Sequence, residues 1–191
     1  MASGGVPGES GRVVDVTHVV VMGVAGSGKT TLALELRRRL GWPYAEADDF
    51  HPQANIDKMT AGTPLTDEDR QPWLAAIRDW LTGEARAGRS TIVTCSALRL
   101  AYRDVLRSAE GRVRFVHLTA DAGLLEQRMA HRSGHFMPPA LLPSQLATLE
   151  PLQDGEDGVA LTVDVPPAEV ADRAIAALGL RPAPGWVPPA S

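Results

Sequence analysis

Cysteine is almost missing from this sequence, in which Cys95 stands alone. No disulfide can therefore form within the chain, which favours a reducing, cytoplasmic location. Long apolar runs are missing too: the longest, about residues 19–25, falls far short of the roughly 20 residues that cross a bilayer. No basic start followed by an apolar stretch marks a secretory signal. We therefore expect no membrane partner.

An excess of basic charge is also absent. The 19 Lys and Arg residues face 23 Asp and Glu, which gives a net charge of −4, and this argues against nucleic acid as a partner. Lysine itself is scarce, because only Lys29 and Lys58 occur. Since arginine is used elsewhere, each lysine indicates a place that needs a compact ammonium group rather than a planar guanidinium.

The length of 191 residues fits a single domain, residues 1–191. We expect its core at about residues 16–180. The stretches 1–15 and 181–191 are expected to be flexible, because the first is rich in Gly and Ser and the second in Pro.

Apolar β-branched runs alternate with helical patterns through the core. Strands are expected at 17–22, 44–47, 91–95, 113–118 and 159–163. Helices are expected at 29–40, 55–60, 66–81, 98–108, 121–132, 144–149 and 168–178. Pro72 should kink or divide the third of these helices. Strands separated by such helices form parallel sheets covered on both faces, so the pattern predicts a three-layer α/β/α sandwich.

A glycine-rich turn joins the first expected strand to the first expected helix. From Gly23 to Thr30 it fits the motif G-x-x-x-x-G-K-[ST], the P-loop that binds nucleotide phosphates. Lys29 would reach the outer phosphates of ATP, and the Thr30 hydroxyl would hold Mg²⁺. Backbone amides and the helix N-terminus would bind the remaining phosphate oxygens. The expected nucleotide ligands in this loop are Gly23, Ala25, Gly26, Ser27, Gly28, Lys29, Thr30 and Thr31.

The chemistry done on the nucleotide depends on carboxylates. The D-x-x-G and N-K-x-D motifs of GTPases do not occur, and the expected strand 91–95 ends without an acid. Glu46, Asp48 and Asp49 instead follow the second strand, at the sheet edge that also carries the P-loop. We assign Asp48 to orient and deprotonate an acceptor hydroxyl during in-line transfer of the γ-phosphoryl group. Glu46 would support Mg²⁺ through water, and either it or Asp49 is the alternative base.

Several blocks beyond the P-loop resemble the gluconokinases, which phosphorylate D-gluconate with ATP. The most specific is H-P-x-x-N-x-x-K-M, beginning at His51. The matching positions are Asp48 to Pro52, Asn55, Lys58 and Met59, Gly62, Pro64 to Thr66, Asp69 and Arg70, Pro72 to Leu74, Cys95 to Leu98, Tyr102 to Asp104, Arg128, Arg132, Gly134 to Phe136, Gln145, Leu149 and Glu150. With the P-loop, the resemblance covers about residues 18–178.

This resemblance implies an adenylate-kinase-like fold with a five-stranded parallel sheet and the product 6-phospho-D-gluconate. It also implies an acceptor-binding segment at 49–80 and a short mobile lid at 131–143. A homodimer is expected only from the resemblance. One departure is Ala47, where the family's acidic turn would have glycine.

The acceptor segment carries few cations, Lys58 and Arg70, between residues 49 and 71. That suits a small acid with many hydroxyls better than the dianionic phosphate of a nucleotide acceptor. Among the regularly spaced Arg99, Arg103 and Arg107, we expect Arg103 to bind the acceptor carboxylate. The expected substrate contacts are Asp48, His51, Lys58, Arg70, Ser96, Arg103 and His135.

Two arginines spaced four residues apart, Arg128 and Arg132, would emerge from one helix side just before the lid. We expect Arg128 to lie against the adenine base and Arg132 to act catalytically on the phosphates when the lid closes. Closure would exclude water and limit wasteful hydrolysis. Two alternatives stay open: another P-loop small-molecule kinase, acting on shikimate or a nucleoside, and a nucleotide-binding module without transfer activity.

Overall fold

The structure is a computed structural model that describes residues 15–130 and 142–187. Its strands are β1 (Thr17–Met22), β2 (Tyr44–Glu46), β3 (Thr91–Thr94), β4 (Arg112–Thr119) and β5 (Gly158–Thr162). Its helices are α1 (Lys29–Leu40), α2 (Gln53–Thr60), α3 (Asp67–Arg86), α4 (Leu100–Arg107), α5 (Ala122–Ala130), α6 (Leu142–Thr148) and α7 (Pro167–Ala177), with a 3₁₀ turn at Ala47–Phe50.

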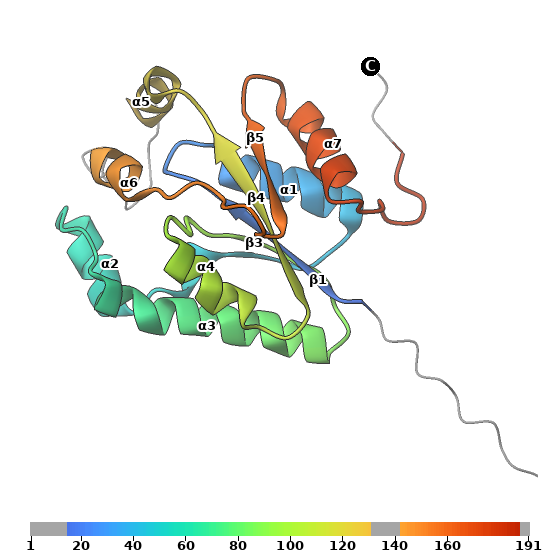
Figure 1. The fold of residues 1–191 in the computed structure, drawn as a ribbon, viewed down its shortest axis with the longest axis horizontal. Coiled ribbons are helices and arrows are strands. Elements are labelled where there is room, and N and C mark those ends of the chain that lie inside the picture. Colours follow the sequence, from blue (N-terminus) through green and yellow to red (C-terminus); the bar gives the residue numbers. More distant parts are fainter. Residues whose placement is uncertain (1–14, 131–141, 188–191) are drawn as a thin grey trace, which may run out of the picture.

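All five strands run parallel in the order β2-β3-β1-β4-β5, which confirms the predicted sheet (Figure 1). The P-loop strand β1 lies in the centre, so both of its edges are hydrogen-bonded. Because every strand points the same way, the loops that follow β1, β2, β3 and β4 meet at one edge of the sheet. This edge is where the predicted functional residues converge.

Helices cover both faces of the sheet, as the three-layer prediction requires (Figure 1). The side chains of β1 alternate between them. Val19 and Val21 pack in a buried cluster with α1 and α7, whereas Val20 and Met22 pack in another with α3 and α4. A third, smaller cluster lies at the functional edge and joins the P-loop to α5 and α6 through Val24, Ala25, Leu98, Leu125 and Leu142.

Most expected elements occur within a few residues of their predicted bounds, but the division of α3 at Pro72 is wrong. The helix runs unbroken from Asp67 to Arg86. Its start is fixed by a capping box in which Thr66 and Asp69 exchange side-chain and backbone hydrogen bonds. Burial of the apolar face, with Trp73 and Ile77 at its centre, offsets the one hydrogen bond that Pro72 removes.

Two features lie away from the functional edge. At the opposite end of the sheet, the buried His18 hydrogen-bonds to the Thr91 hydroxyl at 2.7 Å and to the Glu110 carbonyl at 3.0 Å. Near the C-terminus, the Ala183 amide donates to the Arg39 carbonyl at 2.8 Å, and the Trp186 ring lies under the Arg39 guanidinium. Across the described ranges, no helix is long and apolar enough to span a membrane.

Candidate active site

The glycines of the P-loop adopt backbone conformations that other residues rarely reach. Gly23, Gly26 and Gly28 have φ angles of 139°, 81° and 92°. A Cβ atom on Gly23 would also lie 2.8 Å from the Leu118 carbonyl oxygen and 2.9 Å from Ser27 Oγ. Glycine is therefore required at position 23 both by conformation and by space.

The loop around these glycines fits a bound phosphate chain. Lys29 Nζ donates to the Val24 carbonyl oxygen at 3.0 Å, so the ammonium group lies across the loop. Ser27 Oγ is buried and has no hydrogen-bond partner in the structure, so the loop contains a hydroxyl that a bound phosphate would satisfy. The first-turn amides of α1 have no acceptor inside the helix and add positive potential. These groups match the oxygens of a nucleotide triphosphate.

Arg128 is brought close to this loop. It lies in the last turn of α5, and its Nη1 atom is 3.9 Å from where a Cβ atom on Gly28 would be. Of the expected lid, residues 131–141, with Arg132 and His135, lie outside the described residues. Leu142 and Pro143 belong to α6 rather than to a loop.

The acidic turn follows β2 and is fixed by a hydrogen bond from α3. The buried Trp73 donates its indole N–H to the Ala47 carbonyl oxygen at 2.6 Å, which fixes the 3₁₀ turn that carries Asp48. Ala97 is the one described residue other than glycine with a positive φ angle. Ala47 thus adopts an ordinary conformation, and this turn does not need the glycine expected there.

The turn and the P-loop lysine lie beside the same buried thiol. The pKa of Cys95 is raised to about 12, chiefly by burial and also by the negative charge of Asp48, against a backbone hydrogen bond from Ala97 and the positive charge of Lys29. Both charged groups must therefore lie close to the end of β3. Asp48, the predicted base, and the lysine that would bind the outer phosphates thus both lie within the range of charge interaction of one thiol.

Glu46 is engaged by two hydroxyls. Tyr44 donates to its Oε1 atom and Thr94 donates to its Oε2 atom. Burial, followed by the hydrogen bond and charge of Glu46, raises the pKa of Tyr44, while a hydrogen bond from the Thr30 side chain opposes the rise. Glu46 is thus connected through Tyr44 to the P-loop threonine that was predicted to bind Mg²⁺.

His51 lies on the acceptor side of the turn. Its ring stacks on Trp73 with centroids 4.3 Å apart and planes 11° apart, and its Nδ1 atom is 3.4 Å from Asn55 Nδ2. Burial and the positive charge of Arg70 lower the pKa of His51 to about 4. The imidazole is therefore neutral near pH 7 and has one N–H donor and one acceptor nitrogen.

Lys58, the other expected cation of this segment, holds α2 to α3. Its Nζ atom lies 2.7 and 2.8 Å from the two carboxylate oxygens of Asp69. The same carboxylate closes the capping box with Thr66. Lys58 thus fixes the helix start that borders the cavity described next.

A cavity of about 300 Å³ opens between the start of α3, the loop after β3, and α6. Arg70 and Arg99 are its cationic lining residues. Its lining residues within residues 15–130 and 142–187 are Pro64, Leu65, Thr66, Asp67, Arg70, Leu98, Arg99, Ser144, Gln145 and Thr148. Of the predicted substrate contacts that fall within the described residues, only Arg70 lines it.

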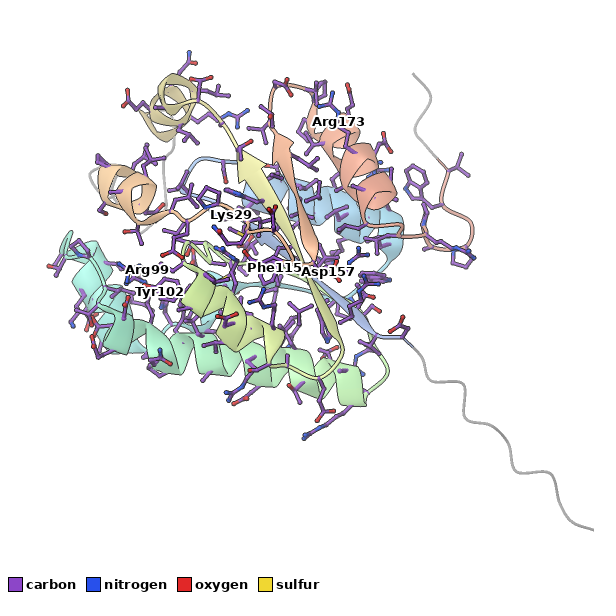
Figure 2. All side chains as sticks on the ribbon, in the orientation of Figure 1. Lys29, Arg99, Tyr102, Phe115, Asp157 and Arg173 are labelled. Atoms are coloured by element: carbon purple, nitrogen blue, oxygen red, sulfur yellow. The ribbon has the colours of Figure 1, made fainter. Side chains whose placement is uncertain are left out.

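The two cationic residues of the cavity are held by one tyrosine and one carboxylate. Arg70 and Arg99 lie over the Tyr102 ring, 5.5 and 5.9 Å from its centroid. Arg99 donates to Asp67 at 2.7 Å, and the Tyr102 hydroxyl donates to the other oxygen of Asp67. Figure 2 shows Lys29 and Arg99 toward the same end of the molecule, where α6 lies.

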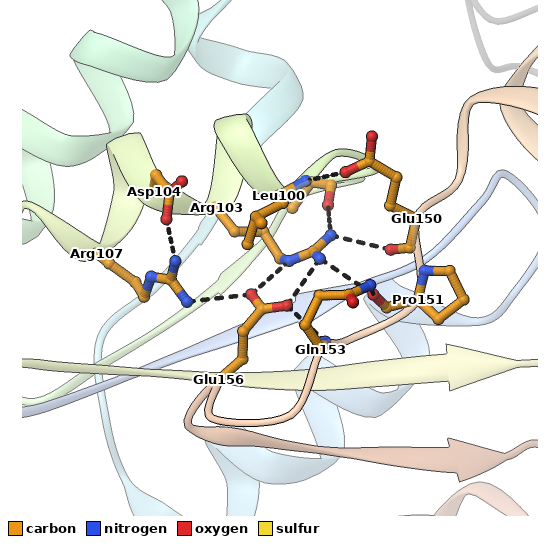
Figure 3. Close-up of polar contacts among 9 residues, drawn as sticks. Leu100, Arg103, Asp104, Arg107, Glu150, Pro151, Gln153 and Glu156 are labelled. Atoms are coloured by element: carbon orange, nitrogen blue, oxygen red, sulfur yellow. Dashed lines mark hydrogen bonds and ion pairs between the residues drawn. The ribbon is translucent and has the colours of Figure 1, made fainter.

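The structure corrects the role expected for Arg103. Its side chain is fully buried and donates to both carboxylate oxygens of Glu156, at 2.7 and 2.8 Å (Figure 3). Its remaining N–H groups bind the carbonyls of Ala97, Glu150 and Pro151 at 3.1 to 3.2 Å. With all five donors used inside the protein, Arg103 fastens the segment after α6 to α4 and has none left for a substrate carboxylate.

Ser96 and Gln145 border the P-loop directly. The Ser96 carbonyl accepts from the Gly23 amide at 3.3 Å. The Gln145 side-chain oxygen accepts from the Ala25 amide at 2.7 Å. Sequence reasoning did not single out Asp67, Arg99 or Gln145 as site residues, although Gln145 belongs to one of the family blocks. The spacing of four did not separate Arg99 from Arg103, and the family block contained only Arg103.

Comparisons with known proteins agree with this geometry. The AAA domain family model matches residues 19–152. The chain is 48% identical to the gluconokinase of Gluconobacter oxydans over 157 residues, which is 82% of this chain and 88% of that protein. It is 39% identical to the thermoresistant gluconokinase of Escherichia coli over 148 residues, 77% of this chain and 85% of that protein.

A solved structure supports the same relationship. The crystal structure of a gluconokinase from Sinorhizobium meliloti matches with a TM-score of 0.77 and 45% identity, and covers 86% of this chain and 93% of that one. An APS kinase from Mycobacterium tuberculosis, at 18% identity and a TM-score of 0.62, shares the fold. The matched relatives, the P-loop and the acidic turn opposite it together make this chain a kinase that belongs to the gluconokinase family.

Proposed function

We propose that this chain transfers the γ-phosphoryl group of ATP to D-gluconate and releases 6-phospho-D-gluconate. The observation that carries the proposal is the hydrogen bond from the Ala25 amide to Gln145. Gln145 also lines the polar cavity, so the phosphate-binding loop and the cavity share a wall. An acceptor in that cavity would lie next to the terminal phosphate, as group transfer requires.

Each chemical task of phosphoryl transfer has a candidate residue. Bound ATP with Mg²⁺ would supply the phosphoryl group and neutralise part of its charge. Lys29 binds the outer phosphate oxygens, while Thr30 and, through water, Glu46 hold the cation. Asp48, on the turn at the functional edge of the sheet, accepts the proton of the acceptor hydroxyl as general base.

The cavity suits a polyhydroxy acid with a single carboxylate. Arg70 and Arg99 present guanidinium groups that can bind a carboxylate by two parallel hydrogen bonds. The neutral His51, which is not a lining residue of the cavity, would offer a donor and an acceptor to hydroxyl groups that extend toward the acidic turn. Arg128 lies against the nucleotide, and the expected roles of Arg132 and His135 in the lid stay predictions, as do the homodimer and the cytoplasmic location.

An acceptor screen tests the reaction. Purified protein is incubated with Mg·ATP and with D-gluconate, shikimate or a nucleoside, and ADP release is followed by a coupled assay. We expect gluconate-dependent ADP formation and a phosphorylated product with the mass of 6-phosphogluconate. Rapid turnover of another acceptor without turnover of gluconate would refute the proposal.

The assignment of the base is tested with neighbouring carboxylates. Asp48→Asn should leave ATP affinity nearly unchanged and lower kcat by about 10²- to 10⁴-fold, the range for removal of a general base. Asp49→Asn is the matched control, because it removes the same charge one residue away on the same turn, where both side chains are exposed. A larger loss of kcat for Asp49→Asn than for Asp48→Asn would move the base to Asp49.

A further inference from the structure

Tyr44 occupies an unusual place for a tyrosine, beside the expected metal site. It begins β2 and is half-buried, and its hydroxyl donates to Glu46 Oε1. The Thr94 hydroxyl donates to Glu46 Oε2 from the neighbouring strand, where Thr94 is the register partner of Glu46. Both oxygens of this carboxylate are thus held by hydroxyl groups of the sheet.

The direction of these hydrogen bonds follows from the chemistry of the groups. An ionised carboxylate can only accept, so the Tyr44 hydroxyl must spend its single proton on Glu46. The phenolic oxygen can then only accept in its contact with the Thr30 side chain. The Thr30 hydroxyl proton therefore points at Tyr44, and the lone pairs of the Thr30 oxygen face away from it.

We propose that Tyr44 is a positioning residue for magnesium, because it directs the lone pairs of Thr30 toward the cation and holds Glu46 in reach of the cation's water shell. The inference rests on the proposed function, in which Thr30 and Glu46 support Mg²⁺. Strand β3 lies between β2 and β1 and ends in Thr94 instead of an acid. Because the Thr94 hydroxyl donates to Glu46, the inference explains how a carboxylate of β2 can serve a metal site next to β1.

Loss of the Tyr44 hydroxyl has two consequences. The Thr30 hydroxyl loses its acceptor and becomes free to donate to a backbone carbonyl three or four residues earlier, in the P-loop, as threonine side chains commonly do. Glu46 Oε1 loses a donor, so the carboxylate is held from Thr94 alone. Loss of the Thr94 hydroxyl removes only the hydrogen bond to Glu46 Oε2 and leaves the contact between Thr30 and Tyr44 unchanged.

The test measures metal affinity directly. Mn²⁺, which prefers similar oxygen ligands to Mg²⁺, is titrated into protein with ADP, and the free ion is followed by electron paramagnetic resonance. We expect Tyr44→Phe to weaken Mn²⁺ binding about tenfold, the lower end of the range for residues that orient metal ligands. Thr94→Val should weaken it less, and ADP affinity without metal should not change.

Tyr102→Phe is the matched control, because it removes the hydroxyl of the chain's other tyrosine, which also donates to a carboxylate. Its Mn²⁺ affinity should equal that of the unmodified protein, and thermal denaturation checks that every variant is folded. Unchanged Mn²⁺ affinity in Tyr44→Phe would overturn the inference, as would an equal loss in Tyr102→Phe. If Tyr44→Phe does not fold, Thr94→Val decides, because an unchanged affinity there means that the hydroxyls do not position Glu46.

A further variant separates this inference from the proposed function. Glu46→Gln should weaken Mn²⁺ binding at least as much as Tyr44→Phe. If Glu46→Gln binds Mn²⁺ as tightly as the unmodified protein, the proposed metal role of Glu46 fails and the inference fails with it. If Glu46→Gln weakens binding while Tyr44→Phe does not, the metal role stands and only the positioning role of Tyr44 is refuted.

Discussion

Substitution of Arg103 by methionine should destabilise the fold without weakening gluconate binding. The change removes both ion-pair contacts to Glu156, whose side chain is 3% exposed, and takes a donor from the carbonyls of Ala97, Glu150 and Pro151, of which Pro151 still accepts from the Gln153 side-chain amide at 2.9 Å. Breaking one side of a buried ion pair costs about 3 to 5 kcal/mol. Arg107 and the Gln153 amide still contact Glu156, at 3.2 and 2.8 Å, which favours the lower end of that range.

The loss can be measured by urea unfolding followed by tryptophan fluorescence, together with a thermal melt. A cost of about 3 kcal/mol corresponds to a fall in Tm of about 6 to 12 °C for a domain of this size. Arg107→Met is the control: Arg107 lies one turn further along α4, contacts the same carboxylate and is 31% exposed, so its loss should cost under about 1 kcal/mol.

The ion pair between Arg103 and Glu156 should also make the stability of the fold depend on pH. Burial tends to raise the pKa of Glu156, but its hydrogen bonds with Arg103 and the Gln153 amide outweigh this, and the net pKa is lowered. The unfolded chain therefore binds this proton first as pH falls, so the stabilisation is complete above the ordinary glutamate pKa and is lost below it. Arg103→Met should flatten this part of the stability profile. Wild-type stability together with a gluconate KM raised tenfold would refute the structural role and restore Arg103 to the substrate site.

Three further predictions follow from individual side chains. His51 should titrate by NMR with a midpoint of about 4, far below the ordinary 6.5, and its contribution to stability should fall as pH drops from 6.5 toward 4; a midpoint near 6.5 would contradict its burial. Cys95, whose pKa is raised to about 12, should not react with a thiol reagent at pH 8 until the protein is unfolded, and stoichiometric labelling of the native protein would be the contrary result. Gly23→Ala should abolish ATP binding, measured by calorimetry, because a Cβ atom would lie 2.8 Å from the Leu118 carbonyl oxygen; retained affinity would show that the loop can rearrange.

The fold was predictable because its signals are local. The P-loop motif fixes a strand before it and a helix after it, and alternating apolar runs then specify a parallel sheet. The prediction of a break at Pro72 was wrong because the capping box and the buried face of α3 stabilise the helix by more than the one hydrogen bond that Pro72 removes. The burial of that face depends on tertiary packing. The sequence shows that Pro72 removes a hydrogen bond, but it does not show how much stability the burial of α3 adds.

The site was predictable only in part. Asp48 and Lys29 follow from strand ends, which topology brings together. Arg99 and Arg103 share the same spacing, and the side chain that reaches the cavity is decided by Glu156, a residue 53 positions further along the chain from Arg103. Contacts between such distant positions leave no periodic pattern in the sequence, so the arginine that lines the cavity could not be chosen in advance.

The His18 contacts at the far end of the sheet bear on how this enzyme could be altered. His18, Thr91 and the Glu110 carbonyl join three strands or loops at the end remote from the phosphate-binding loop. Directed evolution for heat tolerance can therefore concentrate its libraries there without disturbing turnover, whereas libraries aimed at new acceptors belong at the opposite rim. One scaffold thus offers two spatially separate targets for engineering.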